Sequence, residues 1–158
     1  MTYQKDAGEV SARYRNADGV EQLNRSSGGL TRFVAPGSVT GGQFGLFEWN
    51  MPASSGGADP HFHKTFSESF YITAGTVRLF DGATWVSAVK GDFLYVPEGG
   101  IHAFSNDADE PASMLILFAP GAPREKYFRE LVAIRAEGRQ LSDEQWVEFL
   151  ALHDQYRA

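Results

Sequence analysis

The stretch ADPHFHKTFSESFYITAG, residues 58–75, carries two histidines one residue apart and a glutamate five positions after the second. Side chains alternate between the two faces of a strand, so His61 and His63 point the same way and Phe62 faces the opposite side. Glu68 lies an odd number of residues from both histidines, and on one unbroken strand it would face away from them. The polar residues between His63 and Glu68 allow a turn, after which Glu68 returns to the histidine side. The stretch therefore predicts two consecutive strands that bring two imidazoles and one carboxylate to one point.

A second stretch, GDFLYVPEGGIHAFSN at residues 91–106, adds a third histidine after a Pro-Glu-Gly-Gly corner. Glycine adopts the positive φ angles of such corners at little steric cost, so we expect a new strand to begin at His102. The chain has four histidines, and three of them fall within these two stretches. This concentration favours a shared metal ion over three unrelated packing positions.

The chain has no cysteine, so imidazole nitrogen and carboxylate oxygen are its strong metal ligands. We predict that His61, His63, Glu68 and His102 bind one divalent transition metal ion. The candidates are nickel, manganese, iron, cobalt, copper and zinc, because ligand affinity alone does not identify the ion that is used. The fourth histidine, His153, falls on the apolar face of a predicted helix, where we expect it to pack and not to bind metal.

Composition narrows the remaining classes of function. The chain has 158 residues, of which 42% are apolar, and this predicts one globular domain with a sizeable core. Its formal charge of −6 disfavours binding to nucleic acid or to an acidic membrane surface. The first residues lack the apolar run of a signal peptide, and no stretch approaches the roughly 20 apolar residues of a membrane helix. We therefore expect a cytoplasmic protein.

The middle of the chain has the pattern of an antiparallel all-β domain. Short segments rich in β-branched and aromatic residues are separated by Gly, Pro and Asp turns, and this spacing suits a barrel or sandwich. Residues 1–29 are predicted to form an N-terminal arm with an edge strand near Val10, and residues 120–158 a helical extension. The strands expected between them are 30–35, 43–51, 59–64, 67–74, 76–80, 84–89, 92–96, 101–106 and 112–119.

After residue 120 the apolar residues recur at helical intervals. A first helix is expected between Pro123, which suits a first turn, and Gly138, which suits the position after the last turn. Residues 124–126, Arg-Glu-Lys, are expected to be its exposed first turn. A second helix is expected to begin at Ser142, whose hydroxyl can cap it together with Gln145. We expect the two helices to pack outside the sheet or across one mouth of the barrel.

The two stretches resemble the paired signature motifs of the cupin superfamily. The second motif matches at every position, and the first departs only where the family usually has a glycine and this chain has Ser55, which predicts a shifted turn and no lost ligand. The resemblance covers roughly residues 40–119 and implies an all-β, single-domain jelly-roll barrel over residues 30–119, with a 3-His, 1-Glu metal site inside it and two C-terminal α-helices. The matching patterns are His61-x-His63-x4-Glu68-x6-Gly75 and Gly91-x5-Pro97-x-Gly99-x2-His102-x3-Asn106.

Within that superfamily the chain is similar to small bacterial single-domain cupins described as quercetinase-like. This resemblance implies a dioxygenase that cleaves an enolisable, flavonol-like aromatic substrate, with Glu68 acting as both metal ligand and general base. Aromatic residues were expected to line the cavity on inward strand faces, namely Phe44, Phe70, Phe93 or Tyr95, and Phe104.

Two other functions fit the same motifs, because the fold does not fix the activity. The first is a redox-neutral cyclase, isomerase or lyase that acts on a polyketide, keto or sugar-like compound. The second is a non-catalytic binder of small molecules. In each case the expected partners are a small molecule and a second copy of the chain, because an arm next to an open sheet edge is a common basis for a homodimer.

Overall fold

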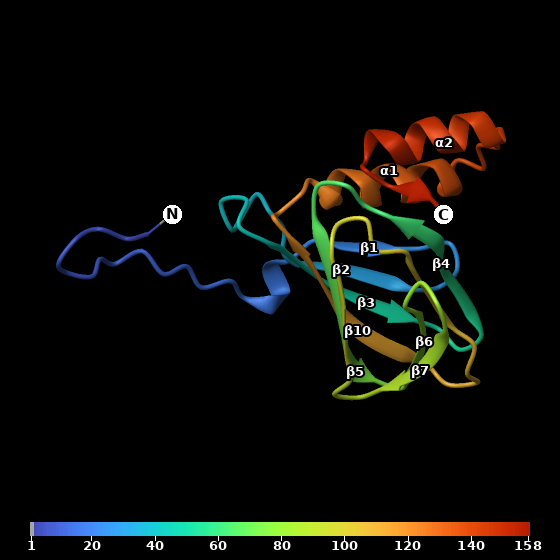
Figure 1. The fold of residues 1–158 in the computed structure, drawn as a ribbon, viewed down its shortest axis with the longest axis horizontal. Coiled ribbons are helices and arrows are strands. Elements are labelled where there is room, and N and C mark those ends of the chain that lie inside the picture. The colour runs from blue at the N-terminus through green and yellow to red at the C-terminus, as the bar shows by residue number, and fades with distance from the viewer. Residues whose placement is uncertain (1) are drawn as a thin grey trace.

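Two antiparallel sheets face each other in the computed structural model, which describes residues 2–158 (Figure 1). The first sheet has six strands, in the order β1 (Gln22–Asn24), β2 (Leu30–Ala35), β3 (Gly45–Met51), β10 (Ala112–Ala119), β5 (Ser67–Ala74) and β8 (Phe93–Val96). The second sheet has five strands, in the order β11 (Tyr156–Arg157), β4 (Ser55–Phe62), β9 (His102–Asn106), β6 (Thr76–Phe80) and β7 (Trp85–Val89). This arrangement is the expected jelly roll, although neither sheet closes on itself as a barrel.

The order of the strands follows the sequence pattern, with three differences. β4 begins four residues earlier than expected and ends two residues earlier, so His63 lies just beyond the strand. The edge strand expected near Val10 is wrong, because that residue is fully exposed and the strand of this segment is β1. β11 was not expected, since a two-residue strand has no periodicity of its own. It forms only because β4 offers it a free edge.

The core lies between the sheets and is made by alternate residues of the central strands. In β3 the buried side chains are Phe47, Trp49 and Met51, and in β10 Ile116 and Phe118 occupy the same inner face. This period of two is what buries one face of each strand and leaves the other free. The aromatic rings meet edge to face, a geometry that their quadrupoles favour.

Of the five aromatic residues named for the inward strand faces, two are buried and three are exposed. Phe70 and Phe104 are buried, whereas Phe44, Phe93 and Tyr95 are exposed. The error in β8 is one of phase, because Val96 is its buried residue and the odd-numbered side chains point outward.

Two helices follow the last long strand and lie together on one side of the molecule (Figure 1). α1 (Arg124–Ala136) is followed by Gly138 at a positive φ of 64°, as expected for a helix end. α2 (Asp143–Leu152) begins with the expected capping box, in which Ser142 and Gln145 each accept a hydrogen bond from the backbone N–H of the other.

The helices cover one end of the jelly roll. Phe128 of α1 packs against the rings of Phe33, Phe47 and Trp49 of the first sheet. α2 packs against β11 of the second sheet. Of the two predicted positions for the helices, across the mouth is therefore the one observed.

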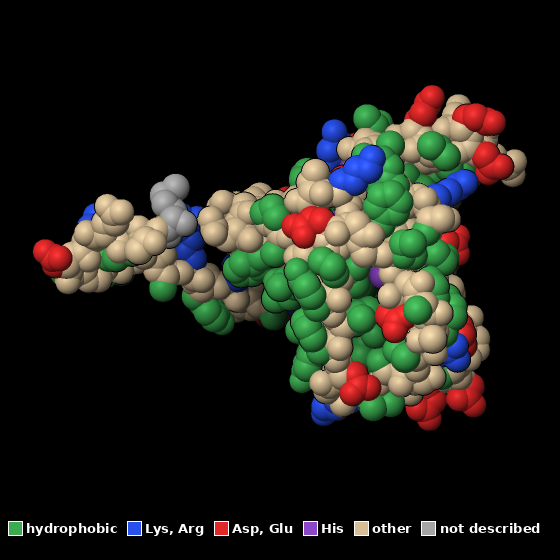
Figure 2. All heavy atoms as spheres, in the orientation of Figure 1, with side chains coloured by type: hydrophobic (Ala, Val, Ile, Leu, Met, Phe, Trp, Pro, Cys, Tyr) green, Lys and Arg blue, Asp and Glu red, His purple; other side chains and the backbone are tan. Residues whose placement is uncertain are grey.

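The two chain ends differ in how they are held. Residues 2–16 extend away from both sheets, and a short 3-10 helix (Ala17–Gly19) follows them before β1 (Figure 1). The last residues return to the body of the molecule as β11, beside β4. No helix in residues 2–158 has the length and apolar character required to cross a membrane. Figure 2 shows acidic side chains at several separate places on the face in view, in a chain with a net charge of −6.

Candidate metal centre

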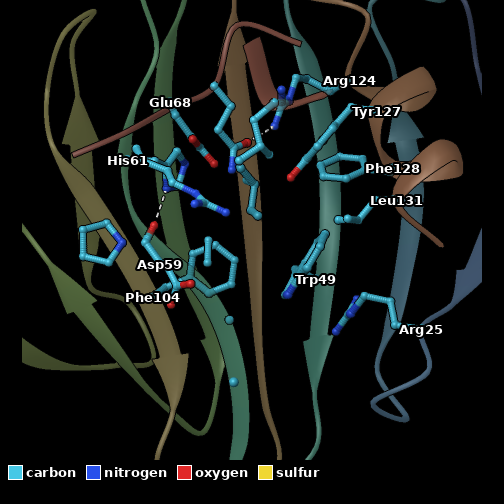
Figure 3. Close-up of a pocket in the computed structure, with 18 of the residues that line it drawn as sticks. Arg25, Trp49, Asp59, His61, Glu68, Phe104, Arg124, Tyr127, Phe128 and Leu131 are labelled. Atoms are coloured by element: carbon cyan, nitrogen blue, oxygen red, sulfur yellow. Dashed lines mark hydrogen bonds between the residues drawn. The ribbon is translucent and has the colours of Figure 1, made fainter. Parts of the chain in front are cut away.

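Four buried side chains from three strands of the jelly roll and the turn beside them meet at one point. His61 comes from β4, His63 directly follows it, Glu68 comes from β5, and His102 begins β9. One potential ligand atom from each residue lies within 4.8 Å of all the others. The structure thus brings together the four residues that the sequence selected as metal ligands, and Figure 3 shows His61 and Glu68 at one end of a cavity.

The local backbone explains how the motif places these residues. His61 pairs directly with His102 across β4 and β9, and the β4 register shifts twice before that point. With Ser55 in place of the usual glycine, these shifts still leave His61 opposite His102. After His63 the chain bends and β5 starts at Ser67, so Glu68 faces the histidines from the opposite sheet.

Two other residues of the motifs, Gly75 and Asn106, support the backbone conformation. Gly75 has a φ of 69°, and a Cβ there would lie 2.4 Å from the carbonyl oxygen of Pro111, so only glycine fits. Asn106 is fully buried and donates from Nδ2 to the carbonyls of Pro52 and Glu110, both at 2.8 Å. The Asn106 side chain is therefore a structural link between two loops and not a ligand.

Two of the three imidazoles are oriented by carbonyls close to them in sequence. His61 Nδ1 lies 2.7 Å from the carbonyl oxygen of Asp59, and His102 Nδ1 lies 3.0 Å from that of Gly100. A carbonyl oxygen can only accept, so Nδ1 carries the proton in both rings. Nε2 of each ring is then the nitrogen directed into the site, which is how metal-binding histidines are usually oriented.

The third imidazole is oriented by the far end of the chain. His63 Nδ1 donates to the carbonyl oxygen of Asp154, at 2.6 Å. The Asp154 carboxylate also accepts hydrogen bonds from the backbone N–H groups of Lys64 and Thr65 and from the Thr65 hydroxyl, the shortest at 2.7 Å. Asp154 has a φ of 53°, a conformation that aspartate tolerates better than most residues. We call this set of contacts the Asp154 clasp.

The charges of the cluster suit a divalent cation. Burial raises the pKa of Glu68, but the hydrogen bonds from His102 and His63 outweigh it, so the net pKa is well below the usual range. Burial lowers the pKa of His61 to about 4. Burial also lowers the pKa of His102, but the hydrogen bond to Glu68 and the negative charge of Glu68, with the hydrogen bond to Gly100, together outweigh this effect and the net shift is upward. Neutral imidazole at His61 and an ionised carboxylate at Glu68 are the donor forms that transition metals bind.

The directions of the ring nitrogens support the same conclusion. Nε2 of His63 lies 2.9 Å from Glu68 Oε2, and Nε2 of His102 lies 2.8 Å from the same oxygen. These two nitrogens donate to the carboxylate, and a metal ion would take the place of their protons, so two nitrogens and one anionic oxygen converge on a common point. The residues present fit a metal ion held by three nitrogens and one oxygen. Their role as ligands, and that of Glu68 in catalysis, stays a prediction.

The cluster opens into a cavity of about 490 Å³, a size typical of sites for small molecules. His61 and Glu68 lie at one end of the cavity, and Trp49, Tyr127 and Phe128 form much of its opposite wall (Figure 3). The wall is therefore largely aromatic, as the sequence predicted, but α1 supplies part of it and only one of the rings named beforehand, Phe104, lines it directly.

The sequence analysis was wrong about Arg124. Residues 124–126 were expected to form an exposed turn, but Arg124 is only 4% exposed and lines the cavity. Its guanidinium donates to the carbonyl of His153 at 2.8 Å and to Gln155 Oε1 at 3.1 Å. It also lies over the ring of Tyr127, 4.1 Å from the centroid, and over three further rings. No periodicity at a helix start signals such burial, because the rings that cover Arg124 come partly from distant strands.

His153 lies outside the cluster, in agreement with the prediction. Its ring packs against Tyr127 and Phe149, and its Nε2 lies 2.7 Å from Glu130 Oε2.

Fold and site together define a two-sheet jelly roll with a candidate site for one metal ion. The family model of the cupin domain matches residues 47–118, which include all four candidate ligands. This part of the chain is a cupin domain.

Comparison with known proteins gives a distant curated relative. The chain is 30% identical over 102 residues to quercetin 2,3-dioxygenase of Bacillus subtilis, and this match covers 65% of the chain and 29% of the relative.

Solved structures support the fold. A sugar phosphate isomerase of the cupin superfamily from Silicibacter pomeroyi matches with a TM-score of 0.58 and 23% identity, over 68% of this chain and 75% of that one. The polyketide cyclase RemF from Streptomyces resistomycificus matches with a TM-score of 0.57 and 16% identity, over 69% and 80% of the two chains. At these identities the likeness shows the fold alone.

Proposed function

We propose that the protein is a metal-dependent dioxygenase that cleaves an enolisable aromatic substrate. The observation that carries the proposal is the buried cluster of three histidines and one glutamate at the end of an aromatic-lined cavity. The likeness to quercetin 2,3-dioxygenase, a protein named for oxygen-dependent chemistry on a flavonol, supports this choice among the functions open to the fold.

The metal would be held by His61, His63, His102 and Glu68. When bound, a nickel, manganese, iron, cobalt, copper or zinc ion supplies Lewis-acid chemistry, and the redox-active ions among them also exchange electrons. The Nδ1 contacts of the three imidazoles would hold their rings in place while the substrate enters and leaves.

Glu68 is the proposed general base. Its carboxylate lines the cavity, so it can accept the proton of a substrate enol or phenol. The neighbouring rings of Trp49, Phe104 and Tyr127 would hold a planar substrate and keep water from the reacting carbon atoms. Loss of the proton makes the substrate electron-rich, which is the condition for its reaction with dioxygen.

The test combines metal analysis with oxygen uptake. Purified protein is expected to contain or take up one divalent ion per chain by mass spectrometry, and to consume oxygen as flavonol absorbance falls. Glu68→Gln is expected to retain the metal and to lose turnover by about 10²-fold or more, the usual cost of a missing general base. Glu48→Gln is the matched control, because Glu48 faces outward beside Arg32.

The results separate this proposal from its alternatives. Product formed without oxygen uptake would indicate a redox-neutral cyclase, isomerase or lyase in place of a dioxygenase. Binding without turnover over a broad panel of enolisable aromatics would indicate a small-molecule binder. Full turnover by Glu68→Gln would remove the glutamate from the role of base.

A homodimer remains part of the proposal. The exposed aromatic side chains of Tyr71, Phe93 and Tyr95 share the outer face of β5 and the edge strand β8, and the N-terminal arm extends away from its own sheets (Figure 1). A second copy would cover both features. Light scattering is expected to give twice the mass of the chain, and a monomeric mass would refute the dimer.

A further inference from the structure

The cavity beside the candidate metal centre is basic in a protein that is acidic overall. Two carboxylates line it, those of Asp59 and Glu68, and Glu68 is committed to the histidine cluster. Four arginines line the same cavity although the whole chain carries a net charge of −6. The four are Arg25, Arg124, Arg135 and Arg157. This contrast points to a ligand with negative charge, because such a cavity concentrates small anions.

Three of these arginines lack a carboxylate partner. In residues 2–158 the arginines that form ion pairs with carboxylates are exposed or only partly buried, and Arg25, Arg124 and Arg135 are not among them. Arg124 is buried, and its Nε has no hydrogen-bond partner within the described chain. Buried cations without a counter-ion are costly, so a ligand that supplies the anion would be bound favourably.

Arg25 is the best-formed of the anion-binding groups. Its guanidinium donates to Thr31 Oγ1 and to the carbonyl of Asn50, both at 2.5 Å, and lies 4.0 Å from the ring centroid of Trp49. These contacts use two of its five N–H donors and hold the group in one orientation. Gly29 allows this position, because a Cβ there would lie 1.9 Å from a guanidinium nitrogen.

Arg135 faces the same end of the cavity from α1. Its positive charge contributes to lowering the pKa of Arg25, after burial, which lowers it more, to about 10. Two positive charges thus lie near each other at one cavity, and in residues 2–158 neither forms an ion pair with a carboxylate. Figure 3 places Arg25 and Trp49 at the end of the cavity away from His61 and Glu68, so an anion held there does not compete for the candidate metal position.

We propose that the cavity binds an aromatic acid whose carboxylate lies between Arg25 and Arg135 and whose hydroxyl end faces the histidine cluster. The proposal rests on the proposed function for the identity of the reacting end, and it adds the substrate class. Guanidinium groups bind carboxylates through paired hydrogen bonds, and the Trp49, Phe104 and Phe128 rings suit the aromatic body.

The test compares two probes that differ only in the terminal group, the carboxylate of 4-hydroxycinnamate and the neutral amide of 4-hydroxycinnamamide. Calorimetry on the metal-loaded protein is expected to show the acid binding at least about 10-fold more tightly, which corresponds to about 1.4 kcal/mol. Arg135→Gln is expected to reduce this preference to about 3-fold or less. Arg139→Gln is the matched control, since Arg139 is at the surface beyond α1 and pairs with Glu137.

Two further measurements keep the result unambiguous. Arg25→Lys retains the charge but loses the paired donors, so it is expected to reduce the preference as well, and circular dichroism checks that it folds. The same titrations on protein stripped of metal by a chelator are expected to show the same preference, because the arginines do not depend on the ion.

Several outcomes would overturn the proposal. Equal affinity of acid and amide for the wild-type protein would do so, as would a preference that both arginine variants retain. A preference found only in the metal-loaded protein would mean that the carboxylate binds the ion. None of these measurements depends on turnover or oxygen uptake. The proposed binding of an aromatic acid can therefore be refuted while the dioxygenase activity is confirmed, and it can be confirmed while the dioxygenase activity is refuted.

Discussion

The cupin domain and the segments that flank it contribute different things to one cavity. Residues 47–118 supply all four candidate metal ligands, and two of the three imidazoles are oriented by carbonyls only two residues away. The flanking segments supply the Asp154 clasp and all four cavity arginines. The domain thus determines that a metal can be held, whereas the flanks orient the third imidazole and set the charge of the cavity that a substrate would enter.

The largest expected effect comes from removing a ligand inside the domain. His102→Ala is expected to reduce metal affinity by more than the roughly 10- to 100-fold that the loss of an outer contact costs, because it removes a donor atom outright. Metal competition with a coloured chelator measures the change. His153→Gln is the control, since His153 lies outside the cluster. Equal metal affinity in the His102 variant and the wild type would contradict the proposed ligand set.

The same division explains what the sequence could predict. The spacing of His61, His63 and His102 around turn-forming glycines is local, so the meeting of these side chains was predicted, although β4 ends before His63. Arg124 and Asp154 were missed because their environments form only after segments distant in sequence pack together. His63 and Asp154 are 91 positions apart, and no periodicity connects them. The phase error in β8 has a related cause, since a four-residue strand contains too few residues to show which face is buried.

The second-largest effect is expected from a substitution at Asp154, which tests whether the C-terminal flanking segment helps to form the site. Asp154→Gly keeps the backbone carbonyl and suits the positive φ, but it removes the carboxylate that holds Lys64 and Thr65. Metal affinity is expected to fall by about 10-fold, because His63 and the following turn lose their support. Asp154→Asn, which keeps one acceptor oxygen, is expected to lose less. Unchanged affinity in the glycine variant would make the clasp a matter of stability alone.

A smaller effect is expected from the cap of α2, the helix that leads to the clasp. Ser142→Ala removes the hydroxyl that accepts from the backbone N–H of Gln145. The expected cost is about 1 kcal/mol in the free energy of unfolding, measured by denaturant titration. Ser142→Asp, which can cap in the same way, is expected to stay near the wild type. Metal affinity is expected to be unchanged in both, because the folded position of Asp154 is the same.

The smallest expected effect concerns the ion pair that connects the N-terminal flanking segment to the C-terminal one. Arg129 Nε and one terminal nitrogen donate to the two carboxylate oxygens of Glu21, at 2.9 and 2.5 Å. The hydrogen bond from Arg129 lowers the pKa of Glu21 below its ordinary value of 4.5. Because the folded-state pKa is the lower one, the pair stabilises the fold above about pH 4.5 and loses this contribution as the pH falls through the folded-state pKa.

Both side chains of this pair are partly exposed, so the contribution is expected to be only about 0.2–1 kcal/mol. The measurement is the difference in the free energy of unfolding between wild type and Glu21→Gln, taken from pH 7 downward. The histidine cluster titrates in both proteins and cancels in the difference, so the difference should be constant near neutral pH and shrink below about pH 4.5. A difference that does not shrink there would mean that packing, and not the charge pair, holds the N-terminal segment to α1.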